Sequence, residues 1–188
     1  MIFEKLIAFV GLACAMPLSA QMPDAEAMRA EQRAAMEAFA FMDGEWRGTV
    51  TSQGPEGETV LTQTERVGTM AGGVVRIVEG RGYADNGDLE FNAVAMIAYD
   101  PMADEYVMTS TAQGFTARPW FRPTENGFEW GLTSGPVTFT YEAVVEDGRW
   151  AEDGYMQFGE EPRRKFLEMR LERVADSDWP EAGVVGPE

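Results

Sequence analysis

The chain has 188 residues, of which 45% are hydrophobic, 25% charged and 11% aromatic, a composition that fits one globular domain with a sizeable core. Its 32 acidic and 15 basic residues give a formal net charge of −17, which repels phosphate backbones and anionic membrane faces, so we expect no nucleic-acid binding. The sequence contains no His, which excludes the Ser-His-Asp triad, the Cys-His dyad, His-ligated haem and the usual zinc sites.

Residues 1–20 have the pattern of a secretory signal peptide. Lys5 precedes an uncharged apolar run over 6–16, and small residues lead to a cleavage point after Ala20. The run is shorter than the roughly 20 apolar residues that a bilayer span needs, so we expect export, with no stable membrane insertion of the mature chain. Cys14 fits a lipoprotein signal poorly, so lipid anchoring is not expected. The mature chain would have no Cys, which favours a bacterial periplasm.

Residues 21–43 are predicted to form an amphipathic helix. Pro23 suits the first helical position, and Met28, Met36 and Met42 belong to an apolar stripe at helical spacing. Asp43 and Gly44 end the pattern.

From position 44 the pattern changes to short strands separated by turn residues, and Asn-Gly and Asp-Gly pairs mark hairpins. We expect strands at 45–53, 58–67, 74–82, 90–99, 105–112, 115–122, 128–133, 136–146, 149–158 and 164–174. Since the turns leave no room for crossover helices, the prediction is an all-β domain over 44–174: an antiparallel meander of eight to ten strands closed into a barrel. The acidic, Gly- and Pro-rich stretch 175–188 is predicted to be a disordered tail.

Both ends of this strand region carry residues typical of one superfamily. Gly44 and Trp46 form a Gly-x-Trp at the first strand, and Arg173 lies on the apolar side of the last strand. The chain thereby resembles the calycin superfamily, which includes lipocalins and fatty-acid-binding proteins. The resemblance implies a lipocalin-like barrel closed at one end by the Trp46 indole, with the Arg173 guanidinium packed across it.

More narrowly, the chain resembles a group of bacterial exported lipocalin-like domains of unknown function. The likeness covers roughly residues 36–174 and rests on the motif 41–46, on Glu65 followed by Gly72-Gly73, and on the motif 98–101 with Tyr106 after it. This resemblance implies a fold and a possible internal cavity, and it transfers no catalytic residues.

Ten aromatic residues crowd the segment 115–158, which predicts either an aromatic-lined cavity or the packed core of a small barrel. Alternation along the strands selects candidates for a ligand pocket. They are Tyr106, Met108, Phe128, Trp130, Phe139 and Tyr141.

Glu65 and Arg76 are a candidate cross-strand pair, because a hairpin centred between Met70 and Ala71 would set them opposite each other. An inward pair could hold the polar head of a ligand, whereas an outward pair would be an ordinary surface ion pair.

The favoured hypothesis is therefore an exported soluble barrel that binds a small apolar or aromatic ligand in its interior. Two alternatives stay open: a His-independent isomerase or hydratase that uses carboxylates or Tyr in the same barrel, and a solid-barrel envelope protein that acts through protein partners. An outer-membrane barrel is disfavoured by the charged face of the last strand. No metal or cofactor is expected. The ligand's identity and the oligomeric state have no signal in the sequence.

Overall fold

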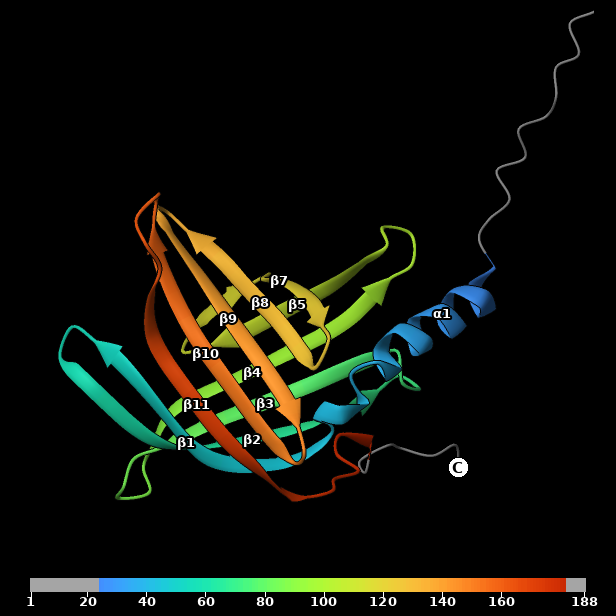
Figure 1. The fold of residues 1–188 in the computed structure, drawn as a ribbon. Coiled ribbons are helices and arrows are strands. Elements are labelled where there is room, and N and C mark those ends of the chain that lie inside the picture. Colours follow the sequence, from blue (N-terminus) through green and yellow to red (C-terminus); the bar gives the residue numbers. More distant parts are fainter. Residues whose placement is uncertain (1–23, 182–188) are drawn as a thin grey trace, which may run out of the picture.

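The computed structural model describes residues 24–181, in which a short helical segment leads into a single closed β-barrel (Figure 1). The predicted signal peptide and the end of the predicted tail, 182–188, lie outside the described residues.

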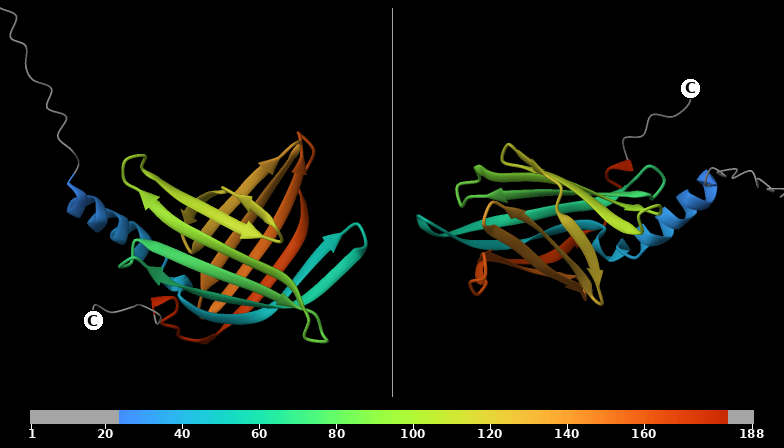
Figure 2. Two further views of the ribbon diagram at one scale, coloured as in Figure 1. Left: turned by 180° about the vertical axis from the view of Figure 1, so that it is seen from behind. Right: turned by 90° about the horizontal axis from the view of Figure 1, so that it is seen from above.

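The predicted helix is divided into two parts. α1 runs over Ala25–Glu37 and is capped by Asp24, whose side chain accepts a hydrogen bond from the Glu26 amide. A single 3₁₀ turn, η1, follows over Ala40–Met42. The outer part of α1 extends away from the barrel, and its C-terminal end lies against β4 (Figures 1 and 2). Among residues 24–181, no helix is long and apolar enough to cross a membrane.

The strands follow one another with short connections. They are β1 (Gly44–Gly54), β2 (Gly57–Met70), β3 (Val75–Tyr83), β4 (Leu89–Asp100), β5 (Glu105–Ala112), β6 (Phe115–Ala117), β7 (Trp120–Thr124), β8 (Gly127–Ser134), β9 (Val137–Glu146), β10 (Arg149–Phe158) and β11 (Arg164–Ala175). Every ladder is antiparallel, and neighbours in sequence are neighbours in the sheet except β6 and β7, which both pair with β5, so the expected meander is confirmed.

The meander closes because β1 pairs with β11 along most of its length, from Trp46 opposite Arg173 to Ser52 opposite Leu167. The ring contains ten strands, β1 to β5 and β7 to β11, which confirms the all-β barrel fold (Figures 1 and 2). Closure leaves the ring without a free edge.

The predicted strand 115–122 is corrected to two strands, β6 and β7, interrupted at Arg118–Pro119. Both lie in the same register against β5, but proline has no N–H to donate to the ladder. Among the described residues, β7 and β5 are joined by one ladder pair, Val107 with Trp120, which makes this the thinnest part of the ring.

The seam between β1 and β11 carries the residues expected there. The Arg173 guanidinium carbon lies 5.6 Å from the centroid of the Trp46 ring, and Arg173 also forms an ion pair with Asp176. Gly44 begins β1 at a φ of +126°, and a Cβ there would lie 2.8 Å from the Ala175 carbonyl oxygen. Gly44 therefore lets the two strand ends approach where a larger residue would not fit.

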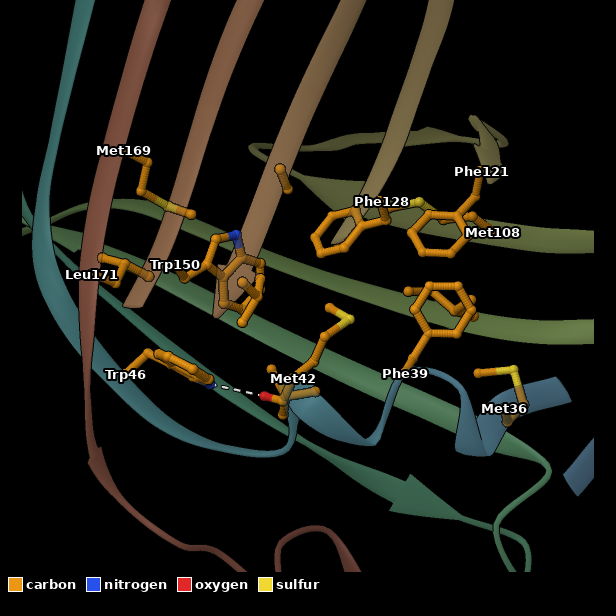
Figure 3. Close-up of a cluster of buried hydrophobic side chains, with 14 residues drawn as sticks. Met36, Phe39, Met42, Trp46, Met108, Phe121, Phe128, Trp150, Met169 and Leu171 are labelled. Atoms are coloured by element: carbon orange, nitrogen blue, oxygen red, sulfur yellow. Dashed lines mark hydrogen bonds between the residues drawn. The ribbon is translucent and has the colours of Figure 1, made fainter. Parts of the chain in front are cut away.

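The segment from Phe39 to Met42 closes the barrel end next to this seam (Figure 3). The Trp46 indole Nε1 donates a 2.8 Å hydrogen bond to the Met42 carbonyl oxygen, and Phe39 packs against the rings of Tyr106 and Phe121. Phe39, Met42 and Trp46 are all 2% exposed or less, so this segment forms a plug of buried side chains. The opposite end of the barrel, called the open end, is where the β1–β2, β3–β4, β5–β6, β8–β9 and β10–β11 connections turn.

Part of the predicted disordered tail is placed against the barrel. β11 continues to Ala175, and Trp179 then lies under the Arg66 guanidinium of β2, 4.3 Å from ring centroid to guanidinium carbon.

Replacing Trp46 by Ala removes a fully buried indole and its hydrogen bond to the plug. We expect a loss of about 3–5 kcal/mol in the free energy of unfolding, measured by urea denaturation. Trp120→Ala is the matched control because Trp120 is 39% exposed. Equal losses from the two substitutions would show that Trp46 does not stabilise the closed end.

Candidate functional site

The interior of the barrel holds a cavity of about 300 Å³ above the plug. Met42 forms its floor, and Ser52, Phe91 and Ala112, close to the hairpin tips, mark its other limit, so the cavity extends toward the open end. The wall is mostly apolar and aromatic. It consists of Val50, Leu61, Gln63, Glu65, Val78, Gly80, Ala93, Val94, Ala95, Ile97, Met108, Ser110, Phe121, Phe128, Trp130, Tyr141, Trp150, Glu152, Leu167 and Met169.

Aromatic rings form one side of the cavity. Trp130 on β8 and Tyr141 on β9 are direct ladder partners, and their rings stack in parallel with centroids 3.9 Å apart. Phe128 packs edge-on against Trp150 at 5.7 Å and stacks on Phe121 at 5.4 Å. These flat faces suit apolar or planar ligand groups and can also bind a cation.

Glu152 is one of two carboxyl groups in this wall. It lies on β10 between Ala143 of β9 and Met169 of β11, and alternation along β10 turns it inward with Trp150. The indole nitrogens of Trp130 and Trp150 each donate a 3.2 Å hydrogen bond to it, one to each carboxyl oxygen. Glu152 is 8% exposed.

Glu65 on β2 is the second carboxyl group. Gln63, two residues earlier on the same inward face, donates a 2.7 Å hydrogen bond to its Oε1. Its ladder partner on β3 is Gly80, where a Cβ would lie 2.7 Å from one carboxyl oxygen and 2.8 Å from the other. Glycine at position 80 therefore provides the space that the carboxyl group occupies.

Both carboxyl groups hold a proton more tightly than usual. Burial raises the pKa of Glu65 from 4.5 to about 8; the Gln63 hydrogen bond opposes this, and the charges of Glu152 and Glu79 add to it. Burial also raises the pKa of Glu152 to about 7, against the effect of the two indole hydrogen bonds. In the described chain no Lys or Arg lines the cavity, so neither carboxylate has a cationic partner there.

Five of the eight residues predicted for a ligand pocket lie in this wall: Met108, Phe128, Trp130, Tyr141 and Glu65. The other aromatic candidates lie elsewhere. Tyr106 on β5 packs against Phe39 of the plug, and its hydroxyl donates to the Ala35 carbonyl oxygen of α1. Phe139 packs edge-on against Phe166. Contact of any of these residues with a ligand stays a prediction.

The expected pairing of Glu65 with Arg76 is wrong. The turn between β2 and β3 occupies four residues, 71–74, so Arg76 lies opposite Thr69. Arg76 is instead buried beneath the helical segment, where Nε and Nη2 donate to the two oxygens of Asp43 at 2.7 and 2.9 Å. It also donates to the Met36 carbonyl oxygen. Arg76 thus fixes the plug to β3 and is not part of the cavity.

The sequence interpretation missed Glu152 and Gln63. Apart from Glu65, nearly all of the carboxylates were expected in turns or on polar strand faces, and Glu152 stands beside Asp153 in what looks like an interruption of a strand. The available signal was the alternation of the two strand faces. Glu152 lies two positions after Trp150 and therefore on the same face, and Gln63 and Glu65 share a face with Leu61 and Val67.

Across residues 24–181, no group of three or more Cys, Asp or Glu side chains is arranged to hold a metal ion. The sequence matches no family model and no curated protein. Among solved structures, that of Rv2717c from M. tuberculosis is similar, with a TM-score of 0.58 and 12% sequence identity. The match covers 74% of this chain and 97% of that one, and at this identity it shows a shared fold alone.

The raised pKa of Glu65 makes stability depend on pH. Between about pH 5 and pH 8 the folded protein keeps a proton on Glu65 that the unfolded chain releases, so the free energy of unfolding falls as the pH rises through this window. Glu65→Gln removes the titrating group. We expect this variant to lose less stability than the wild type between pH 5.5 and 8.5 in urea unfolding.

Glu146→Gln is the matched control, because Glu146 is exposed at the plugged end of β9. Its pH dependence should follow the wild type. If Glu65→Gln also follows the wild type, the Glu65 carboxyl is not desolvated.

Proposed function

We propose that this protein is an exported, lipocalin-like barrel that binds a small apolar or aromatic molecule in its interior. The observation that carries the proposal is the cavity of about 300 Å³, walled largely by apolar and aromatic side chains, in a barrel with one plugged end. A ligand would enter between the hairpins of the open end.

Membership of the calycin superfamily is part of this proposal. Its support is the ten-stranded antiparallel ring, the short helical segment before β1, and the Trp46–Arg173 contact at the seam. Export to a bacterial periplasm rests on the sequence pattern of residues 1–20.

Catalysis within the same cavity is a second candidate, favoured by Glu65 and Glu152. Two carboxyl groups with pKa values of about 8 and about 7 can exchange protons near neutral pH, as general acid–base chemistry requires. The reaction classes that fit are isomerisation and hydration, which need proton transfer without a metal.

Filling the cavity should abolish ligand binding. Ala95→Phe and Ser110→Phe each place a ring into the cavity from neighbouring strands, β4 and β5. With the uncharged fluorescent probe N-phenyl-1-naphthylamine, we expect at least about a tenfold weaker Kd for either variant. Met96→Phe is the control, since Met96 lies on β4 and is 46% exposed.

Native mass spectrometry of protein purified gently from its own envelope then tests for a natural ligand. An added small mass, absent from the Ala95→Phe protein, supports the proposal. A clean apo mass in repeated preparations, together with no probe binding, would contradict it and favour action through protein partners.

The proposed catalysis is tested with the natural small molecule, once it has been extracted from the purified protein. Proton transfer in the cavity would exchange one of its C–H hydrogens for deuterium in D₂O, detected by NMR, and Glu65→Gln would abolish the exchange. Exchange that is unchanged in Glu65→Gln would exclude the role of this carboxyl.

A further inference from the structure

The polar atoms in the cavity wall give information about the ligand itself. Glu65 on β2 and Glu152 on β10 are the two ionisable carboxyl groups in the wall, and both line the same cavity. They therefore form a local acidic site inside an otherwise apolar chamber. A buried carboxylate without a countercharge is costly, so the groups that face it reveal which partner it lacks.

Those facing groups are hydrogen-bond donors. Gln63 donates to Glu65, and the indoles of Trp130 and Trp150 donate to Glu152. These donors can accommodate the carboxylate form of each group, and a ligand nitrogen that carries positive charge would supply the countercharge that the cavity wall lacks.

The rest of the cavity and its entrance favour the same partner. Aromatic rings line the cavity, and a ring face that no other ring covers attracts cations. The open-end turns carry Glu56, Asp85, Asp88, Glu160 and Glu161, against Arg163 in the last turn and Arg164 at the start of β11. With a net charge of −17, the molecule attracts cations and repels anions on approach.

We propose that the ligand of this cavity carries a cationic nitrogen, such as a primary ammonium or an amidinium, on an apolar or aromatic body, with the nitrogen bound at Glu65 and Glu152. This inference rests on the proposed interior-binding function and specifies its ligand class. The apolar body would lie against the rings of the wall, toward the open end.

Binding of such a ligand is coupled to proton release. The charges of Glu152 on β10 and Glu79 on β3 raise the pKa of Glu65, and Asp153 acts in the same way on Glu152. Glu79 lies on the outer face of the sheet, paired with Arg66 and Arg81, and among the described residues no Lys or Arg lines the cavity itself. An incoming ammonium stabilises the carboxylates, so near pH 7 the protein releases protons as the amine binds, and affinity rises from pH 6 to pH 8.

Three probes with one ring system separate charge from apolar contact: 2-naphthylmethylamine, 2-naphthylmethanol and 2-naphthoate. By calorimetry at pH 7.5, we expect the ammonium to bind at least about tenfold more tightly than the alcohol, and the carboxylate to bind most weakly. Repeating the amine titration in buffers of different ionisation enthalpy measures the released protons.

Variants assign the effect to the two carboxyl groups. Glu65→Gln and Glu152→Gln should each reduce the preference for the amine to less than about threefold and reduce the proton release, with the affinity for the alcohol nearly unchanged. Glu146→Gln should behave as the wild type. Far-UV circular dichroism and binding of the alcohol show that each variant is folded with its cavity intact.

The outcomes distinguish this inference from the proposed function. Equal binding of amine and alcohol, with both lost in Ala95→Phe, would overturn the amine inference and leave the interior site standing. Tightest binding of naphthoate would likewise overturn it, showing that protonated carboxyls receive an anion. Binding of none of the three probes overturns the amine inference, and if native mass spectrometry also finds no added mass, the proposed function fails with it.

Discussion

Pairing of β1 with β11 is the constraint on which the rest of the molecule depends. It converts a meander into a ring, and the ring encloses the largely apolar cavity. Trp46 lies at this seam and also holds the Met42 carbonyl, so the same side chain joins closure of the wall to closure of one end. Without that double closure, the carboxyl groups on β2 and β10 would be hydrated, and their pKa values would be ordinary.

The enclosed carboxyl groups show how the fold balances stability against a binding site. An apolar pair at positions 65 and 152 would pack well in a barrel core, yet the chain places acids there, three donors around them, and a glycine opposite Glu65 to make room. Each of these features keeps space or polarity where a core optimised only for stability would have neither. This local conflict is the strongest structural sign of a functional site in the described residues.

The sequence predicted the fold well because each of its signals was local. Alternation located the strands and Asn-Gly and Asp-Gly pairs located their turns, while the Gly-x-Trp and Arg173 marked the two ends that meet. The failures involved register and burial. A four-residue turn moved Arg76 away from Glu65, and Pro119 divided one strand in two. Alternation along β10 could have placed Glu152 on the same face as Trp150, but its contact with Trp130 joins β10 to β8, which are not neighbouring strands, and had no local signature.

The interruption at Pro119 has a further consequence for motion. Backbone hydrogen bonds are the main resistance to separating neighbouring strands, and β7 is joined to β5 through one ladder pair, whereas β4 pairs with β5 through eight residues. Local separation costs least where so few bonds must break. We therefore expect the ring to open locally between β5 and β7. The backbone amides beside Val107 and Trp120 would then exchange hydrogen with solvent sooner than those of the β1–β11 seam.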